Sequence, residues 1–329
     1  MDITYDANSP MQQRWGEMLS EFLWPAMSSY TDQSSVTMAD FGAATGLNSC
    51  KTFKPLLERF RAASSASVWL YHTDRPENHW STLFSNLVSH ADSYRSVSNV
   101  HSFAIGQSFY TQLFPDNSLD IGYACSAFHW LAQPYPTNLL ISSRTLSFES
   151  SPQVLAHHQD NLATILRLRQ SELKPGGHLI FNLPDGTNQA PSVFHAPIEV
   201  ASEMKAEGLI PDGYLEHFPI PVTRFSAETN LEVIRSLGTY EVVNTKVLTD
   251  DFILYKQYKE TGDLETYVKR FAGFTRAYLY PYLKGMCTKG EEGEALIQLF
   301  FTKLEEKVRS NPEPLTMTQS FFHLKKLSN

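Results

Sequence analysis

The run from Met38 to Asn48, MADFGAATGLN, does most to limit what this chain can fold into. Residues 36–41 are apolar enough for a buried strand, and Asp40 stands near its end. Gly42 allows close approach of the backbone to another group, and Gly46 permits a sharp reversal before a helix. A strand, a glycine turn and a helix predict the start of a βαβ unit. The run has neither the GxGxxG of dinucleotide sites nor the Gly-Lys-Ser/Thr of phosphate loops, so a nucleotide-type ligand and a turn without ligand both stay open.

The same alternation of patterns continues along the chain. It predicts strands at 36–41, 67–71, 99–105, 119–125 and 178–182, a sharp turn at 174–177, and helices at 11–27, 48–63, 77–90 and 153–173. Such an alternation is typical of a mostly parallel sheet. Beyond this point the patterns predict helices at 194–207, 227–237, 264–283 and 292–309 and strands at 240–249 and 315–324. We expect an α/β core that the last strands complete, with the added helices over the carboxyl edge of the sheet, where ligands bind in open α/β folds.

Composition and charge exclude several classes of protein. The 329 residues are 42% hydrophobic, which suffices for one large domain with an elaboration or for two small ones. A net charge of -8 without a lysine or arginine run argues against a nucleic-acid partner. Cys50, Cys125 and Cys287 show neither zinc-ligand spacing nor a disulfide framework. Because no stretch resembles a signal core or the roughly 20 apolar residues of a membrane span, we expect a soluble cytoplasmic protein that binds no membrane.

Polar or aromatic residues with binding potential follow the second and third predicted strands. Asp74 comes after the strand at 67–71, where a carboxylate can accept hydrogen bonds from ribose hydroxyls. A solvated loop or a helix cap before Pro76 is the alternative for this aspartate. Ser108 and Phe109 follow the third strand, where a hydroxyl and a ring can bind the edge and the face of an adenine. A capping serine beside a core phenylalanine is the alternative for that pair.

The segment 124–131 leaves the fourth predicted strand and carries His129 and Trp130. Because the carboxyl ends of parallel strands meet at one edge of a sheet, these side chains can enter an active site there. The start of an amphipathic helix with a core histidine and a core tryptophan explains the same residues. The segment on its own therefore leaves both interpretations open.

Several motifs at concordant spacing resemble those of the SABATH family of S-adenosylmethionine (SAM)-dependent methyltransferases, known mainly for methylating small carboxylic acids. The family's Tyr-x-x-Asn-Ser-x-x-Gln opening matches Tyr5–Gln12, and its Asp-Leu-Gly-x-x-x-Gly-x-Asn loop matches Asp40–Asn48. Its Ser-Phe-Tyr-x-x-Leu-Phe-Pro run matches Ser108–Pro115, and its Ser-Leu-His-Trp-Leu-Ser-Gln segment matches Ala127–Gln133. Parts of 207–221 resemble the family's cap. The resemblance covers most of the chain, and the joint spacing makes it specific.

The resemblance implies a Rossmann-like SAM-dependent methyltransferase fold, in which a seven-stranded, mostly parallel sheet carries a helical cap. Residues 1–30 would form an N-terminal lid. The SAM-binding α/β core would comprise 31–190, 238–256 and 311–329, and the helical cap around the acceptor pocket would comprise 191–237 and 257–310. By analogy alone, a homodimer is a further expectation.

The resemblance also implies roles for individual residues. SAM, which becomes S-adenosylhomocysteine (SAH) in the reaction, would be held by Tyr5, Ser9, Asp40, Gly42, Asn48, Asp74, Arg75, Ser108, Phe109 and Ser126. The residues that contact the acceptor would be Gln12, His129 and Trp130. The aromatic residues of the predicted cap suggest Phe225 as a further contact with the acceptor, and a place in the plain core is the alternative for it. The N–H groups of Gln12 and Trp130 would hold the carboxylate of the acceptor as a catalytic clamp, with His129 beside them. Some relatives carry magnesium near the cap, but no carboxylate cluster here demands it, so no metal ligand is predicted.

The chain departs from the family pattern at Ala43–Thr45, at Arg75 and at Thr223, which replace Cys-Ser-Ser, a leucine and a pocket-facing tyrosine. These differences leave the expectation of SAM binding in place and leave the identity of the acceptor open. We predict methyl transfer to the carboxylate oxygen of a small organic acid, giving a methyl ester. The alternatives are methylation of a phenol or a nitrogen of a small metabolite, with His129 as the base for a phenol, and a protein of the same fold that binds SAM without transferring its methyl group.

Overall fold

Seven strands form one sheet in the part of the chain that the computed structural model describes, residues 8–132, 152–187, 193–210, 222–286 and 291–328. They are β1 (Ser35–Phe41), β2 (Ser67–Asp74), β3 (Val100–Gly106), β4 (Leu119–Ala124), β5 (Leu173–Pro184), β6 (Tyr240–Asp251) and β7 (Thr316–Lys326). The strand order is β3-β2-β1-β4-β5-β7-β6, and β7 runs antiparallel to both of its neighbours. The prediction of a mostly parallel, seven-stranded sheet is confirmed.

The order of the strands reverses at β1. From β1 the chain moves outward to β2 and β3, and it then returns to the other side of β1 with β4 and β5. Ligands of open α/β sheets bind beyond the carboxyl ends of the strands at such a reversal. The segments that follow β1, β2, β3 and β4 carry most of the predicted site residues, so the topology brings them to one edge.

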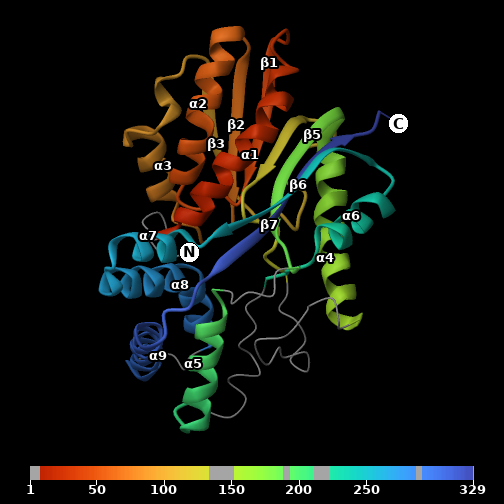
Figure 1. The fold of residues 1–329 in the computed structure, drawn as a ribbon. Helices are drawn as coiled ribbons and strands as arrows, with labels where there is room; N and C mark the ends of the chain where they lie inside the picture. The colour runs from red at the N-terminus through yellow and green to blue at the C-terminus, as the bar shows by residue number, and fades with distance from the viewer. Residues whose placement is uncertain (1–7, 133–151, 188–192, 211–221, 287–290, 329) are drawn as a thin grey trace.

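Helices cover both faces of this sheet (Figure 1). They are α1 (Pro10–Ser28), α2 (Leu47–Ala63), α3 (Trp80–Ser89), α4 (Pro152–Glu172), α5 (His195–Ala206), α6 (Ala227–Ser236), α7 (Ile253–Thr261), α8 (Leu264–Met286) and α9 (Glu291–Ser310). Figure 1 shows α1, α2 and α3 on one side, α4 and α6 on the other, and α5, α7, α8 and α9 gathered below the sheet. Within the described ranges, no helix combines the length and the apolar character needed to span a bilayer.

Alternation along the strands divides the core between the two faces. Met38 and Phe321 belong to the apolar cluster under α1 and α2, whereas their neighbours Ala39 and Phe322 belong to the cluster under α4 and α6. Successive side chains of a strand point to opposite faces, so a central strand is covered on both. β4 shows this most clearly, because all six of its residues are buried.

The helix predicted at 11–27 is confirmed as α1, with its apolar side in the core. The prediction that a turn at 174–177 precedes the strand is wrong, because β5 already begins at Leu173, beside Leu119 of β4. Between that pair and the next, the two strands lose register, and Gly176 takes φ +78° inside the excursion. The pattern of a turn thus marks an interruption within β5. The sequence analysis also missed α7, which follows β6 directly.

Candidate active site

Asp40, next to the carboxyl end of β1, is held inside the protein by its neighbours. The residue is 2% exposed. Its Oδ2 accepts a 2.6 Å hydrogen bond from Ser49 Oγ of α2 and lies 2.8 Å from His72 Nδ1 of β2. The other ring nitrogen of His72 contacts the Tyr94 hydroxyl. This buried chain fixes the orientation of the carboxylate, and sequence analysis missed it because its members share no local pattern.

The loop from Gly42 to Gly46 turns tightly at the end of β1. The N–H groups of Gly42 and Ala43 donate to the carbonyl of Thr73, at 2.8 and 3.0 Å. Gly42 has φ +82°, and a Cβ added there would lie 2.5 Å from the Cβ of Ala127. The glycine is therefore required by the close approach of this loop to the segment after β4. Gly46, with φ +80°, forms the N-cap of α2.

Asp74, the last residue of β2, faces the same loop. Its Oδ2 accepts a hydrogen bond from the Ala44 N–H and its Oδ1 accepts one from the Arg75 N–H, both at 2.8 Å. Burial raises the pKa of Asp74, and these two hydrogen bonds oppose that rise. The side chain of Arg75 is 70% exposed and lies 3.3 Å from Glu77. The structure thus places the Asp74 carboxylate at the loop and the Arg75 side chain at the surface.

Ser9 and Asn48 meet although 39 positions separate them. Asn48, in the first turn of α2, donates from Nδ2 to Ser9 Oγ at 3.0 Å. Ser9 is the residue before α1 and is 1% exposed. The contact joins the start of α1 to the helix that follows the glycine loop. Tyr5, another predicted SAM ligand, lies outside the described residues.

Ser108 and Phe109 lie on the loop that follows β3. Ser108 Oγ accepts a hydrogen bond of 3.2 Å from the Tyr110 N–H. The Phe109 ring packs edge-on against Phe128, with 5.4 Å between the ring centroids. The Tyr110 hydroxyl donates to the carbonyl of Trp130 at 2.9 Å. This loop is thereby tied to the segment that carries the predicted acceptor clamp.

A cavity lies between α1, the segment after β4, the end of β5 and the start of β7. Its walls include four of the predicted residues, Gln12, Ser126, His129 and Trp130. Most of the other lining side chains are apolar, among them Met11, Trp15, Val193, Phe194, Val222, Phe274, Tyr278 and Met317. The structure therefore brings the predicted clamp residues together on one largely apolar cavity.

The segment 222–225 is attached to the clamp through its backbone. Val222 pairs with Trp130 in an isolated antiparallel bridge, and the Thr223 N–H donates to the His129 carbonyl at 2.9 Å. Phe225, predicted as an acceptor contact, is not part of the cavity lining in the described residues. It is 1% exposed, and its ring stacks on that of His158 with centroids 4.1 Å apart. The packing of this segment places Phe225 in a separate apolar cluster.

His129 is neutral in the cavity at physiological pH, because burial lowers its pKa to about 3. Its Nδ1 and the Oε1 of Gln12 are buried without a hydrogen-bond partner in the described part of the chain. The ring of His129 lies beside that of Trp130, with 5.3 Å between the centroids. An imidazole whose conjugate acid has so low a pKa is a weak base.

The described lining of the cavity also includes two charged residues that sequence analysis missed, Asp185 and Arg224. Asp185 Oδ1 accepts hydrogen bonds from the N–H and the hydroxyl of Thr187. Its Oδ2 accepts them from the Ala227 N–H and the Ser320 hydroxyl. Burial lowers the pKa of Arg224, and the charge of Asp185 opposes this shift. The position of Asp185 directly after β5, at the carboxyl edge of the sheet, is the signal that could have found it.

Comparison with known proteins identifies the family. A family model described as SAM dependent carboxyl methyltransferase matches residues 2–327. The chain belongs to this family. The methyltransferase is 26% identical over 273 residues to probable caffeine synthase 4 of Camellia sinensis, which covers 73% of this chain and 74% of that protein. It is 24% identical over 328 residues to indole-3-acetate O-methyltransferase 1 of Arabidopsis thaliana, which covers 88% of this chain and 81% of that protein.

The solved structure of loganic acid methyltransferase with SAH has a similar fold. It matches the methyltransferase with a TM-score of 0.78 at 18% identity, over 100% of this chain and 98% of that chain. This confirms the Rossmann-like methyltransferase fold. Membership of the family makes the protein an enzyme, with SAM as its cofactor. Within the described residues, the methyltransferase has no group of three or more His, Cys, Asp or Glu side chains placed to hold a metal ion.

Proposed function

We propose that the methyltransferase transfers the methyl group of SAM to a carboxylate oxygen of a small organic acid and releases the methyl ester and SAH. The observation that carries this proposal is the chemistry of the cavity around Gln12, His129 and Trp130. The cavity offers neutral N–H donors and the oppositely charged residues Asp185 and Arg224, but its histidine is only a weak base. This combination suits an acceptor that arrives already ionised.

The ordinary pKa values of the acceptors favour a carboxylate over a phenol. A carboxylic acid has an unperturbed pKa of roughly 4, whereas that of a phenol is near 10. The acid is therefore ionised at neutral pH without help, and a phenol needs a base. His129, with a pKa of about 3, is poorly matched to that task.

A heterocyclic nitrogen is the second candidate acceptor, because relatives include probable 7-methylxanthine methyltransferase 5 of Theobroma cacao, 27% identical over 236 residues. Such an acceptor is neutral. Arg224 on the cavity wall attracts an anion, but the charge of Asp185 on the same wall opposes this attraction, so these two residues do not separate an acid from a neutral ring. The carboxylate remains the preferred acceptor because the matching family model describes carboxyl methyltransferases.

The residues at the carboxyl edge of the sheet fit SAM. The Asp74 carboxylate suits the ribose hydroxyls, and Ser108 and Phe109 suit the edge and the face of the adenine. We assign the methionine end to the residues around the glycine loop and the start of α1, namely Ser9, Asp40, Gly42, Asn48 and Ser126. Arg75 and Phe225 have no part in this assignment, because their side chains lie at the surface and in a separate cluster. Tyr5 stays a prediction.

When bound, SAM supplies an electrophilic methyl group. Gln12 and Trp130 hold and orient the carboxylate through neutral N–H groups, which leave the oxygen more nucleophilic than direct pairing with an arginine would. The apolar lining excludes water. Because the charges of the carboxylate and the sulfonium cancel during transfer, a dry cavity does not oppose the reaction. Alignment of the reacting atoms at about 3 to 3.5 Å is then the main contribution of the protein.

We also propose that the enzyme works in the cytoplasm, which the scattered cysteines support; Cys50 and Cys125 are free thiols. We keep the division into an N-terminal lid, an α/β core and a helical cap as a proposal. It is supported by the position of α5, α7, α8 and α9 below the sheet (Figure 1), whereas α6, which the prediction assigned to the cap, packs with α4 on a face of the sheet. Homodimer formation stays a prediction.

The decisive experiment incubates the purified enzyme with methyl-labelled SAM and a panel of small carboxylic acids, phenols and N-heterocycles. We expect label in a base-labile methyl ester. Label in a phenol or on a nitrogen would contradict the carboxylate. SAM binding without transfer to any member of the panel would favour the non-methylating alternative.

A variant separates the acid from the phenol more sharply. Because His129 stays neutral above pH 5 and supplies no proton transfer to an acid, the kcat of H129N with an acid substrate should keep the flat pH profile of the wild type between pH 6 and 8. A kcat that follows the ionisation of a histidine in the wild type and loses this dependence in H129N would contradict the proposal.

A further inference from the structure

The loop after β3 forms neither helix nor strand between Gln107 and Ser118, yet its backbone groups are bound. Their partners are Arg169 and Glu172, which lie in the last turns of α4. Both side chains are completely buried. Arg169 Nε donates to Glu172 Oε2 at 2.7 Å, and Arg169 Nη2 donates to Glu172 Oε1 at 2.8 Å. The two side chains thus form a two-armed, fully buried ion pair.

Burying two charges has a desolvation cost that their mutual attraction offsets only when further hydrogen bonds satisfy the remaining groups. The loop provides these hydrogen bonds. Arg169 Nη1 donates to the carbonyl of Phe109 at 2.7 Å, and Nη2 donates to the carbonyl of Thr111 at 2.9 Å. Glu172 Oε1 accepts from the N–H groups of Leu113 and Phe114, at 2.6 and 3.3 Å. Four backbone groups of the loop therefore end on one ion pair.

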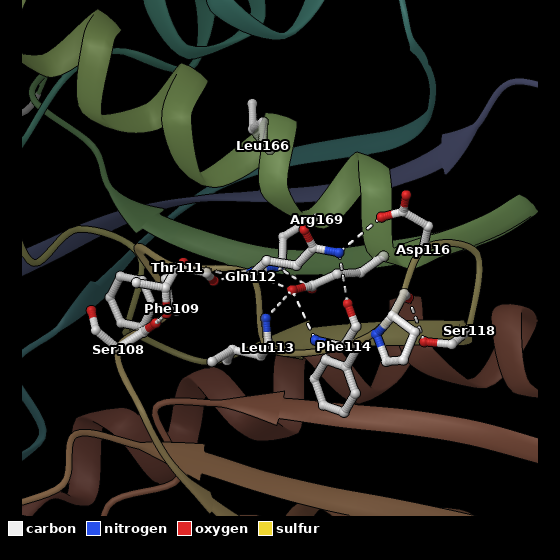
Figure 2. Close-up of polar contacts among 12 residues, drawn as sticks. Ser108, Phe109, Thr111, Gln112, Leu113, Phe114, Asp116, Ser118, Leu166 and Arg169 are labelled. Atoms are coloured by element: carbon white, nitrogen blue, oxygen red, sulfur yellow. Dashed lines mark hydrogen bonds and ion pairs between the residues drawn. The ribbon is translucent and has the colours of Figure 1, made fainter.

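Figure 2 shows this arrangement, with the loop from Ser108 to Ser118 passing beside Arg169. The guanidinium of Arg169 also lies over the ring of Phe41, 4.5 Å from its centroid. Phe41 is the residue before Gly42, so the ion pair contacts the end of β1 as well as the loop after β3. Both segments carry residues that we assign to SAM.

We propose that Arg169 and Glu172 are positioning residues for the cofactor: they hold the loop in the shape that presents Ser108 and Phe109 to the adenine of SAM. This rests on the adenine assignment above, and not on the identity of the methyl acceptor. The pair acts through the loop, since its charged groups are directed at the backbone of residues 109–114. If the ion pair served stability alone, weakening it would destabilise the protein but leave its recognition of the adenine unchanged.

The test compares E172Q with L166A, a control on the same helix. Glutamine keeps the size of the side chain but leaves the buried charge of Arg169 without its counter-ion. Leu166 is completely buried one turn earlier, in the apolar cluster between α4 and the sheet, and the hydrogen bonds from α4 to residues 109–114 are made by Arg169 and Glu172 instead. Truncating a buried leucine destabilises a protein to a similar degree as breaking a buried ion pair. We therefore expect the two variants to lose similar amounts of unfolding free energy and to differ in their contact with the loop.

Calorimetry would measure the Kd of SAH and of S-inosylhomocysteine, in which an oxygen replaces the 6-amino group of the adenine. The titrations are run well below the unfolding transition of each variant. We expect E172Q to weaken SAH binding about tenfold, equivalent to about 1.4 kcal/mol. We also expect the ratio between the Kd values of S-inosylhomocysteine and SAH to be smaller in E172Q than in the wild type. L166A should leave both Kd values within about twofold of the wild type, because the energetic effect of a substitution in the core is nearly independent of contacts at a distant ligand site.

Wild-type Kd values in a folded but destabilised E172Q would overturn the proposal, and so would equal weakening of SAH by E172Q and L166A. If E172Q does not fold, R169K carries the same test, because lysine keeps the charge but cannot make the two-armed contact together with both carbonyl contacts. The assay contains no methyl acceptor. Failure of carboxyl methylation would therefore leave this test intact.

Discussion

Substituting Gly42 by alanine should weaken the fold by an amount that the structure allows to be divided into two parts. The first part is backbone strain. Gly42 has φ +82°, and an L-residue in this left-handed region costs about 1 to 2 kcal/mol. The second part is overlap, because the new Cβ would lie 2.5 Å from the Cβ of Ala127. Forcing such atoms back to ordinary contact costs about 1 to 3 kcal/mol.

We therefore expect G42A to lose about 2 to 5 kcal/mol of unfolding free energy. Gly238 provides the matched control, because it has φ +64° and a Cβ there would meet nothing within 4 Å. G238A should show the strain alone, about 1 to 2 kcal/mol. Urea unfolding of both variants, followed by fluorescence and circular dichroism, measures the difference between them.

A third variant isolates the overlap. In the double variant G42A/A127G the atom that the new methyl group meets is absent, so a double-mutant cycle should give a favourable coupling of about 1 to 3 kcal/mol. A coupling near zero, or equal losses in G42A and G238A, would refute the claim that Gly42 is required by its approach to Ala127.

Three further predictions concern the cavity and the buried histidines. W130F keeps a ring but removes the N–H donor to a charged acceptor, so kcat/KM for the acid substrate should fall about tenfold to a hundredfold, from a loss of roughly 1.5–3 kcal/mol; an unchanged rate would contradict the clamp. R224Q should raise KM for acids and leave that of a neutral N-heterocycle unchanged in competition assays, and equal effects on both would indicate a purely structural arginine. His178 Nδ1 and His323 Nε2 lie 2.8 Å apart, and burial lowers the pKa of each to about 4. Because an unfolded histidine has a pKa near 6.5, His178 and His323 bind protons at a higher pH in the unfolded chain than in the folded protein. The contribution of the neutral pair to stability is therefore fully present above pH 6.5 and is lost as the pH falls towards 4. Urea unfolding should show that the unfolding free energy of the wild type is lower at pH 5 than at pH 7.5 by an amount on the order of 1–2 kcal/mol, after allowance for partial solvent screening. The corresponding decrease should be smaller in H323Q. Equal decreases in the two proteins would contradict this role of the pair.

Much of the candidate site follows from local sequence patterns combined with one rule of topology. The run from Asp40 to Asn48, the aspartate at 74 and the pair Ser108–Phe109 each come at or just after a strand that hydrophobic periodicity predicts. Parallel strands place their carboxyl ends at one edge of a sheet, so these segments had to converge. The contact of Ser9 with Asn48 has another origin, because Ser9 precedes α1 and every strand and is brought to Asn48 by the packing of α1 against α2.

The position of Phe225 did not follow from sequence. The aromatic residues of the predicted cap suggested Phe225 as an acceptor contact, but the backbone contacts of Val222 with Trp130 and of Thr223 with His129 set the direction of the segment. The ring then packs on His158, which lies on α4 far along the chain. No local pattern encodes which of several aromatic residues in a segment enters a cavity, because that depends on the packing of other elements.

By itself the sequence determined the order and type of most helices and strands, and the position of the cofactor segments along the chain. Both depend on short-range periodicity, glycine turns and apolar faces, which neighbouring residues carry. Only the tertiary structure decided that β7 lies between β5 and β6, that Gly42 lies against Ala127, and that Arg169 and Glu172 bind the loop after β3. These features join residues tens to more than a hundred positions apart, and the free energy that selects them comes from packing and from hydrogen bonds formed only when the whole sheet is assembled.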